Sequence, residues 1–116
     1  MAPKLITEFL GTFFLVLTIG LTVLIGSALA PLAIAGVLVA VIYMGGHVSG
    51  AHYNPAVTLA VWLRGKVTLP EAGGYMAVQV LAGIVAAFAT ATITGDVLQV
   101  TPAAETGLGA FLLLEL

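Results

Sequence analysis

A short polar run near the middle of the chain, Asn54-Pro55-Ala56, holds residue types suited to contact a small polar molecule. Asparagine is a preferred helix N-cap, and proline suits the first helical position because it lacks an N–H and has a fixed φ. The apolar segment that follows ends at about residue 63, whereas a membrane span needs about 20 residues. We therefore expect a half-helix that begins at Asn54 and points its positive dipole end into the bilayer.

Four residues precede this run: Gly50, Ala51, His52 and Tyr53. We expect them to be extended and to offer their backbone carbonyl oxygens to a permeant molecule. Non-helical backbone at membrane depth is tolerated only where it is buried in protein or lines a water-filled cavity. A plain loop followed by a helix is the alternative that an Asn-Pro pair alone allows.

The remaining candidate groups do not form a recognisable catalytic or metal-binding pattern. No cysteine is present, which excludes disulfides, thiolate metal sites and cysteine nucleophiles. His47 and His52 are poorly spaced for two ligands on one helix face, and no nearby carboxylate pair completes a metal site. Ser49 has no general-base arrangement beyond these histidines. We expect no metal, no cofactor and no enzymatic chemistry.

Glu8 lies within a long apolar run, where a charged side chain is costly and commonly functional. The alternative interpretation is an interfacial residue that extends toward the membrane surface close to Lys4. A proton relay is disfavoured because relays need several titratable partners.

The composition identifies the environment in which these residues act. Of 116 residues, 61% are hydrophobic and 7% are charged, compared with roughly 25% charged residues in soluble domains. The mean hydropathy is +1.22. So few charges cannot cover a water-facing surface, which excludes a soluble domain, a nucleic-acid binder and a disordered chain. The sequence predicts an integral, multi-pass membrane protein.

Apolar runs place three membrane spans at about residues 5–26, 31–47 and 70–93, with a loop and half-helix at about residues 47–63. Basic residues tend to remain cytoplasmic. Lys4 and the pair Arg64 and Lys66 share that side only if two full spans separate them. The segment between must then enter and leave the membrane on one side, as a re-entrant half-helix. The N-terminus is predicted to be cytoplasmic.

Three segments carry a resemblance to a known family. Residues 46–60 (GHVSGAHYNPAVTLA) resemble the first Asn-Pro-Ala loop of the aquaporin, or major intrinsic protein, family. Residues 8–13 (EFLGTF) are similar to the first helix of that family, and Gln79, Gly83 and Ala86-Ala87 to its third. The resemblance implies an all-α membrane fold with three transmembrane helices and a re-entrant half-helix. Residues 1–107 would form the first repeat, and residues 108–116 would begin the second repeat and a fourth span.

The resemblance also implies a function, because the family's full unit has two half-helices in two inverted repeats. We expect a passive channel for water and small neutral solutes such as glycerol, excluding protons and ions. Asn54 would donate to the permeant molecule, and Glu8 would support the loop. The implied partners are the bilayer, the missing second half of the channel and three further copies in a homotetramer of the complete protein.

Two positions give conflicting indications of solute range. Ile34 falls where many water-selective relatives place a phenylalanine of the outer constriction, so it weakens strict water selectivity. Tyr53 is aromatic, as the resemblance leads us to expect in water channels rather than glycerol channels. The rival hypothesis is a small membrane protein, or an assembly partner, that conducts nothing alone. An ion or proton carrier is disfavoured by the scarcity of intramembrane charge.

Overall fold

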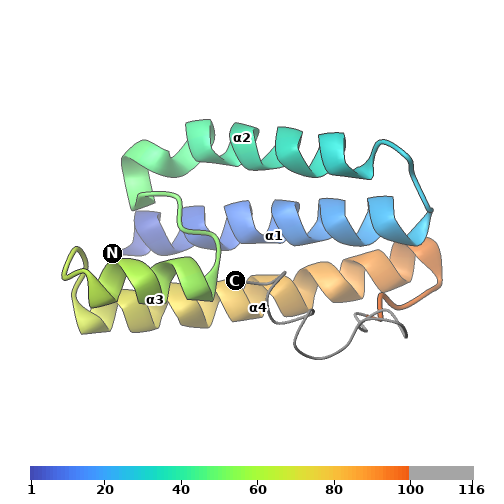
Figure 1. The fold of residues 1–116 in the computed structure, drawn as a ribbon. Helices are drawn as coiled ribbons and strands as arrows, with labels where there is room; N and C mark the ends of the chain where they lie inside the picture. The colour runs from blue at the N-terminus through green and yellow to red at the C-terminus, as the bar shows by residue number, and fades with distance from the viewer. Residues whose placement is uncertain (100–116) are drawn as a thin grey trace, which may run out of the picture.

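The computed structural model describes residues 1–99 and forms four helices within that range. They are α1 (Ala2–Leu24), α2 (Ala30–Ser49), α3 (Pro55–Leu63) and α4 (Leu69–Thr94), shown in Figure 1. Three of them, α1, α2 and α4, are long and apolar enough to cross a membrane, whereas α3 is a nine-residue half-helix. The described part of the chain contains no strand. The predicted all-α fold of three spans and one half-helix is confirmed.

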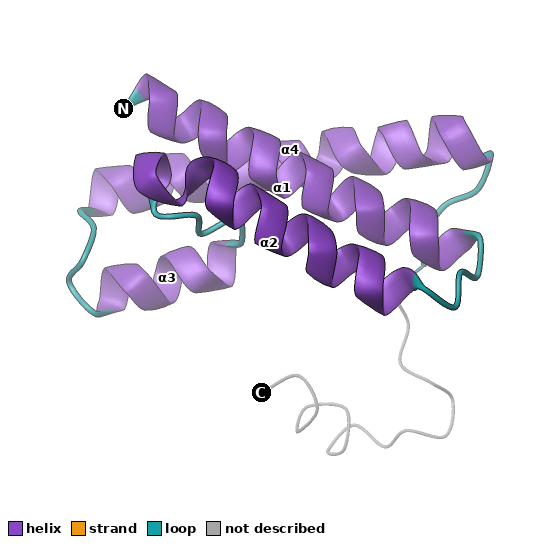
Figure 2. Cartoon of the chain, turned by 90° about the horizontal axis from the view of Figure 1, so that it is seen from above, coloured by secondary structure: helices purple, strands orange, loops and turns teal. Residues whose placement is uncertain are grey.

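Helix α1 occupies the centre of the bundle, packed against α2 on one side and α4 on the other. Helix α3 packs against α4 alone among the described helices. In Figure 1, α3 begins near the middle of the bundle and runs back to the end at which α1 begins. The view from above shows that α3 flanks only that half of the bundle (Figure 2). The chain therefore turns at mid-depth and returns to the side from which it came.

Local sequence signals explain where these helices begin and end. Each helix has a proline in its first turn, where the missing N–H costs nothing because that group has no intrahelical partner. Helix α2 ends at Gly50, whose φ of 90° is open to glycine at little cost. Helix α4 is capped by the Thr68 hydroxyl, which accepts from the Glu71 N–H at 3.4 Å.

The helix bounds in the structure differ by a few residues from the expected span bounds. Helix α1 begins at Ala2 rather than near residue 5, and α2 extends to Ser49 rather than residue 47. The re-entrant loop is correspondingly confined to residues 50–54. The predicted repeat boundary near residue 107 and the segment 108–116 lie outside the described residues.

Small side chains allow the helices to approach closely. The buried face of α4 repeats at intervals of three or four residues, as expected for one side of a helix. Its members are Ala72, Tyr75, Gln79, Ala82, Ala86 and Thr90. The outer faces carry large apolar side chains, among them Leu32, Phe88 and Ile93. Small residues inside and large apolar residues outside are the arrangement expected of helices packed in lipid.

Candidate functional site

Asn54 caps the half-helix and thereby fixes the direction of its own amide. Its Oδ1 accepts from the Ala56 N–H at 2.8 Å, and its backbone carbonyl accepts from the Thr58 N–H at 3.0 Å. Because Oδ1 faces the helix, Nδ2 on the other side of the amide carbon faces away from it. Asn54 is exposed, and within residues 1–99 no acceptor meets Nδ2. Two N–H donors are therefore presented in front of the positive end of α3.

The loop before Asn54 has an unusual backbone. Gly50, Ala51 and Tyr53 all have positive φ values, of 90°, 55° and 50°. The expectation of a simply extended segment is wrong at these three residues. The left-handed region costs non-glycine residues roughly 1–2 kcal/mol each, so surrounding contacts must hold Ala51 and Tyr53 there.

Glu8 provides those contacts from α1, and its side chain is completely buried. Its Oε1 accepts from the Ser49 hydroxyl at 2.6 Å and from the His52 N–H at 3.0 Å. Its Oε2 accepts from the Tyr53 N–H at 2.7 Å and from the Gln79 amide at 2.8 Å. The Ser49 hydroxyl in turn accepts from the Ala51 N–H at 3.1 Å, which leaves its proton for Glu8. Four donors match the lone pairs of an ionised carboxylate.

The direction of these N–H groups determines the direction of the loop carbonyls. All peptide bonds in the described residues are trans, and the C=O and N–H of a trans peptide point in opposite directions. The N–H groups of His52 and Tyr53 point to Glu8, so the carbonyls of Ala51 and His52 point away from it. No donor from residues 1–99 meets the carbonyl oxygens of residues 50–53. Four consecutive acceptors therefore precede the Asn54 donor.

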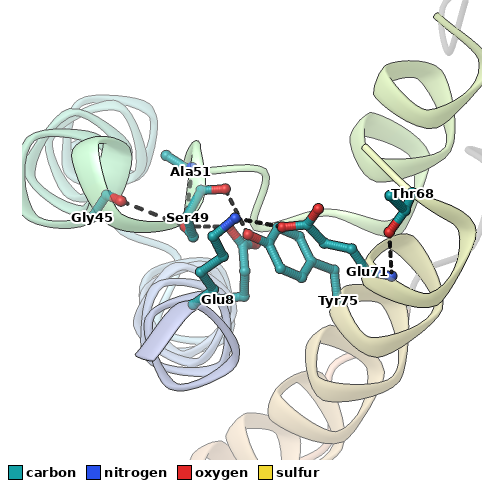
Figure 3. A network of polar contacts seen from close by, with 8 residues as sticks. Glu8, Gly45, Ser49, Ala51, Thr68, Glu71 and Tyr75 are labelled. Atoms are coloured by element: carbon teal, nitrogen blue, oxygen red, sulfur yellow. Dashed lines mark hydrogen bonds and ion pairs between the residues drawn. The ribbon is translucent and has the colours of Figure 1, made fainter. Parts of the chain in front are cut away.

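A second layer of polar side chains surrounds Glu8. Figure 3 shows Ser49 of α2 and Tyr75 of α4 meeting beside it; the Tyr75 hydroxyl donates to the Ser49 carbonyl at 2.8 Å. The Gln79 amide also donates to the Thr58 hydroxyl at 3.0 Å. The His52 ring lies 3.1 Å from that same hydroxyl through Nδ1. These contacts tie the loop and α3 to α4.

Sequence reasoning did not find all of these residues. Tyr75 was not singled out, Ser49 was considered only as a nucleophile, and Gln79 appeared only as part of the family resemblance. The available signal was the spacing of Tyr75 and Gln79, which places two hydrogen-bonding side chains on one face of an otherwise apolar helix.

The predicted site residues do not all come together. The structure brings Glu8, residues 50–53 and the run Asn54, Pro55 and Ala56 into one region. Ile34 lies in the second turn of α2, roughly 24 Å along the helix axis from Gly50. The Tyr53 side chain is buried, with its hydroxyl donating to the Val41 carbonyl at 2.7 Å.

Comparison with known proteins matches this arrangement to one family. The sequence profile described as "Major intrinsic protein" matches residues 1–114. The chain belongs to the major intrinsic protein family. Aquaporin Z of Photorhabdus laumondii is 38% identical over 96 residues, which cover 75% of this chain and 42% of that protein.

Relatives with other names are equally similar. "Glycerol uptake facilitator protein-like 6" of Lactiplantibacillus plantarum is 40% identical over 89 residues, covering 74% of this chain and 41% of that protein. The lens fiber major intrinsic protein of Gallus gallus is 37% identical over 112 residues, covering 89% and 39%. The chain thus spans about two-fifths of the length of these relatives. Family membership and three apolar helices together make it an integral membrane protein.

Proposed function

We propose that this chain forms one half of a passive channel for water and small neutral solutes. The observation that carries the proposal is that the carbonyl oxygens of residues 50–53, which no donor from residues 1–99 meets, immediately precede the outward-facing Asn54 amide in the chain. Water and small alcohols carry both donors and acceptors, so they exchange bulk hydrogen bonds for carbonyls and then for Nδ2. No bond is made or broken in such a passage, and the role is that of a channel and not of an enzyme.

The half-helix adds an electrostatic preference to this path. The positive end of its dipole and the Asn54 N–H groups face the same point, which disfavours a cation there. A water molecule that accepts from Asn54 turns its own hydrogens away, which interrupts a hydrogen-bonded chain able to relay protons. The Glu8 carboxylate, which contacts the loop directly, is shielded behind four donors. We infer that the path excludes ions and protons.

A complete path needs a second half. Helix α3 flanks only half of the bundle's length (Figure 2). The relatives of this chain are more than twice as long as the region that it matches. We propose that a second half-helix meets Asn54 from the opposite side, and that the complete protein assembles as a homotetramer.

The start of α1 and the turn between α3 and α4 lie at one end of the bundle (Figure 1). Lys4, Arg64 and Lys66 therefore share a side, which supports a cytoplasmic N-terminus.

Stopped-flow light scattering on vesicles that hold the protein containing this chain tests the proposal. We expect rapid osmotic shrinkage with a low activation energy, and slower uptake of glycerol measured in the same vesicles. Asn54→Leu should reduce water permeability to the lipid background, whereas Gly36→Ala, at a position with open space, should leave it unchanged. Parent vesicles no more permeable than empty ones would favour the non-conducting assembly partner instead.

A further inference from the structure

Tyr53 is the residue immediately before Asn54, and its side chain is directed into the bundle. It is 3% exposed, although it lies in a loop. Its ring contacts Gly11 of α1, its hydroxyl contacts Gly45 of α2, and the same hydroxyl donates to the Val41 carbonyl at 2.7 Å. One loop side chain is thus inserted between two membrane helices that have no side chain of their own at the points of contact.

The fit between this ring and the two glycines is close. A methyl group at Gly11 would overlap the Tyr53 ring, which supplies all three of the atoms nearest to it. A methyl group at Gly45 would overlap both the Tyr53 hydroxyl and the Thr7 methyl. In this slot between Gly11 and Gly45, the nearest obstacle on the α1 side is thus the Tyr53 ring, whereas Thr7 is a second close obstacle on the α2 side.

The backbone of Tyr53 requires such a hold. Its φ of 50° is unfavourable for a bulky side chain. Glu8 binds the N–H groups of residues 52 and 53, which fixes the orientation of the peptide groups 51–52 and 52–53 but leaves the Cα of Tyr53 as a pivot. A ring held on two sides and hydrogen-bonded at its tip removes this freedom. The direction of the following residue, Asn54, depends directly on the backbone conformation of Tyr53.

We propose that Tyr53 is a positioning residue, a wedge between α1 and α2 that fixes the left-handed turn before Asn54. It acts through the backbone and does not contact the permeant molecule with its side chain. The conflicting indication of solute range from an aromatic residue at this position is then resolved, because the Tyr53 side chain affects conduction only by fixing the direction of the backbone around it. The inference rests on the proposed function for what the loop does, but the wedge itself is tested without any flux measurement.

The test is a double-mutant comparison of Gly11 and Tyr53 in the protein that contains this chain, reconstituted in lipid nanodiscs. Hydrogen exchange of the peptide covering residues 50–54 is measured by mass spectrometry, together with thermal loss of helicity. Gly11→Ala should accelerate exchange in that peptide by about tenfold or more, because overpacking displaces the ring. Tyr53→Leu should slow exchange again in the Gly11→Ala background. Gly36→Ala, on the open side of α2, is the matched control and should change neither measurement.

The Gly45 variant makes the comparison sharper. Tyr53→Leu should fail to rescue Gly45→Ala, since Thr7 still obstructs the methyl group. Tyr53→Phe keeps the ring and removes the hydroxyl, so it should fold and show a smaller increase in exchange than Gly11→Ala. If the effects of Gly11→Ala and Tyr53→Leu simply add, or if Tyr53→Phe matches Gly11→Ala, the wedge is overturned. Rescue of exchange in nanodiscs, together with parent vesicles that conduct no water, would uphold the wedge and overturn the proposed function.

Discussion

Glu8 and Asn54 differ in how their terminal side-chain atoms divide the hydrogen-bonding roles. In Glu8, both oxygens accept, and all four partners are donors. In Asn54, the oxygen serves the helix and the nitrogen faces away from it. Exchanging Glu for Gln, or Asn for Asp, preserves the shape of the side chain but changes its charge and the direction of its hydrogen bonds. Such substitutions therefore test the hydrogen-bonding role of each position without changing its packing.

We expect Glu8→Gln to destabilise the loop although it preserves shape. The glutamine NH2 group, a donor, would replace an oxygen that accepts from two donors. At least one buried N–H or O–H would then be unpaired, at a cost of about 1–3 kcal/mol. Thermal unfolding followed by circular dichroism measures the loss, and hydrogen exchange at residues 52 and 53 locates it. Glu71→Gln, at the partly exposed partner of Lys4, should change stability less. Equal stability of Glu8→Gln and the parent would contradict the assigned hydrogen bonds.

Asn54→Asp separates the helix cap from the donor. Aspartate caps as well as asparagine does, so α3 should persist and stability should remain close to that of the parent. The outward-facing NH2 group, however, is replaced by a carboxylate oxygen, which accepts hydrogen bonds and carries negative charge. We expect water permeability to fall and cation leakage to rise, measured by stopped-flow shrinkage and by a pH-sensitive dye in the same vesicles. Unchanged permeability would remove the Asn54 donor from the path.

At the scale of elements, the contact between α1 and α4 determines whether Gln79 reaches Glu8. Near the far end of this contact, Gly20 faces Thr90, and a methyl group at Gly20 would lie 2.6 Å from the Thr90 hydroxyl oxygen. Close approach at that point depends on glycine, as is usual where membrane helices cross.

We therefore expect Gly20→Ala to lower the free energy of unfolding by about 1–3 kcal/mol through overpacking. Adding Thr90→Ala should recover most of the loss, because it removes the atoms that the new methyl group meets. Gly73→Ala in α4, where nothing lies within 4 Å, is the matched control and should be neutral or stabilising. Thermal unfolding in one detergent gives all four values. A control as damaging as Gly20→Ala would indicate a general intolerance of alanine.

The elements themselves were largely predictable from sequence, whereas their mutual contacts were not. Apolar runs gave the three spans, and the Asn-Pro pair gave the start of α3, because these signals are local. The bond from Glu8 to the Tyr53 N–H joins residues 45 positions apart, and the slot for Tyr53 combines glycines from two helices. Such contacts depend on how helices cross, which hydrophobic periodicity does not encode.

For the whole molecule, the positions of the turns between helices predict which turns face each side of the membrane. The turn between α1 and α2 lies at the opposite end of the bundle from the turn between α3 and α4 (Figure 1). These 116 residues contain no cysteine, so Ala28→Cys and Val67→Cys each introduce a single label into this chain, and any cysteine elsewhere in the protein is first replaced by serine. A membrane-impermeant maleimide applied to intact cells should label only Ala28→Cys, and lysis should expose Val67→Cys. Labelling of both in intact cells would contradict the shared cytoplasmic side of Lys4, Arg64 and Lys66.

The packing of α3 on α4 alone has a consequence for how the chain is made. Synthesis proceeds from the N-terminus, so α1, α2 and the loop leave the ribosome before α4 exists. Glu8 and the slot between Gly11 and Gly45 are then already available to receive the loop, while α3 still lacks its only described helical neighbour. We therefore expect the turn before Asn54 to form early in biosynthesis, and the half-helix to pack against the bundle only after α4 has been made.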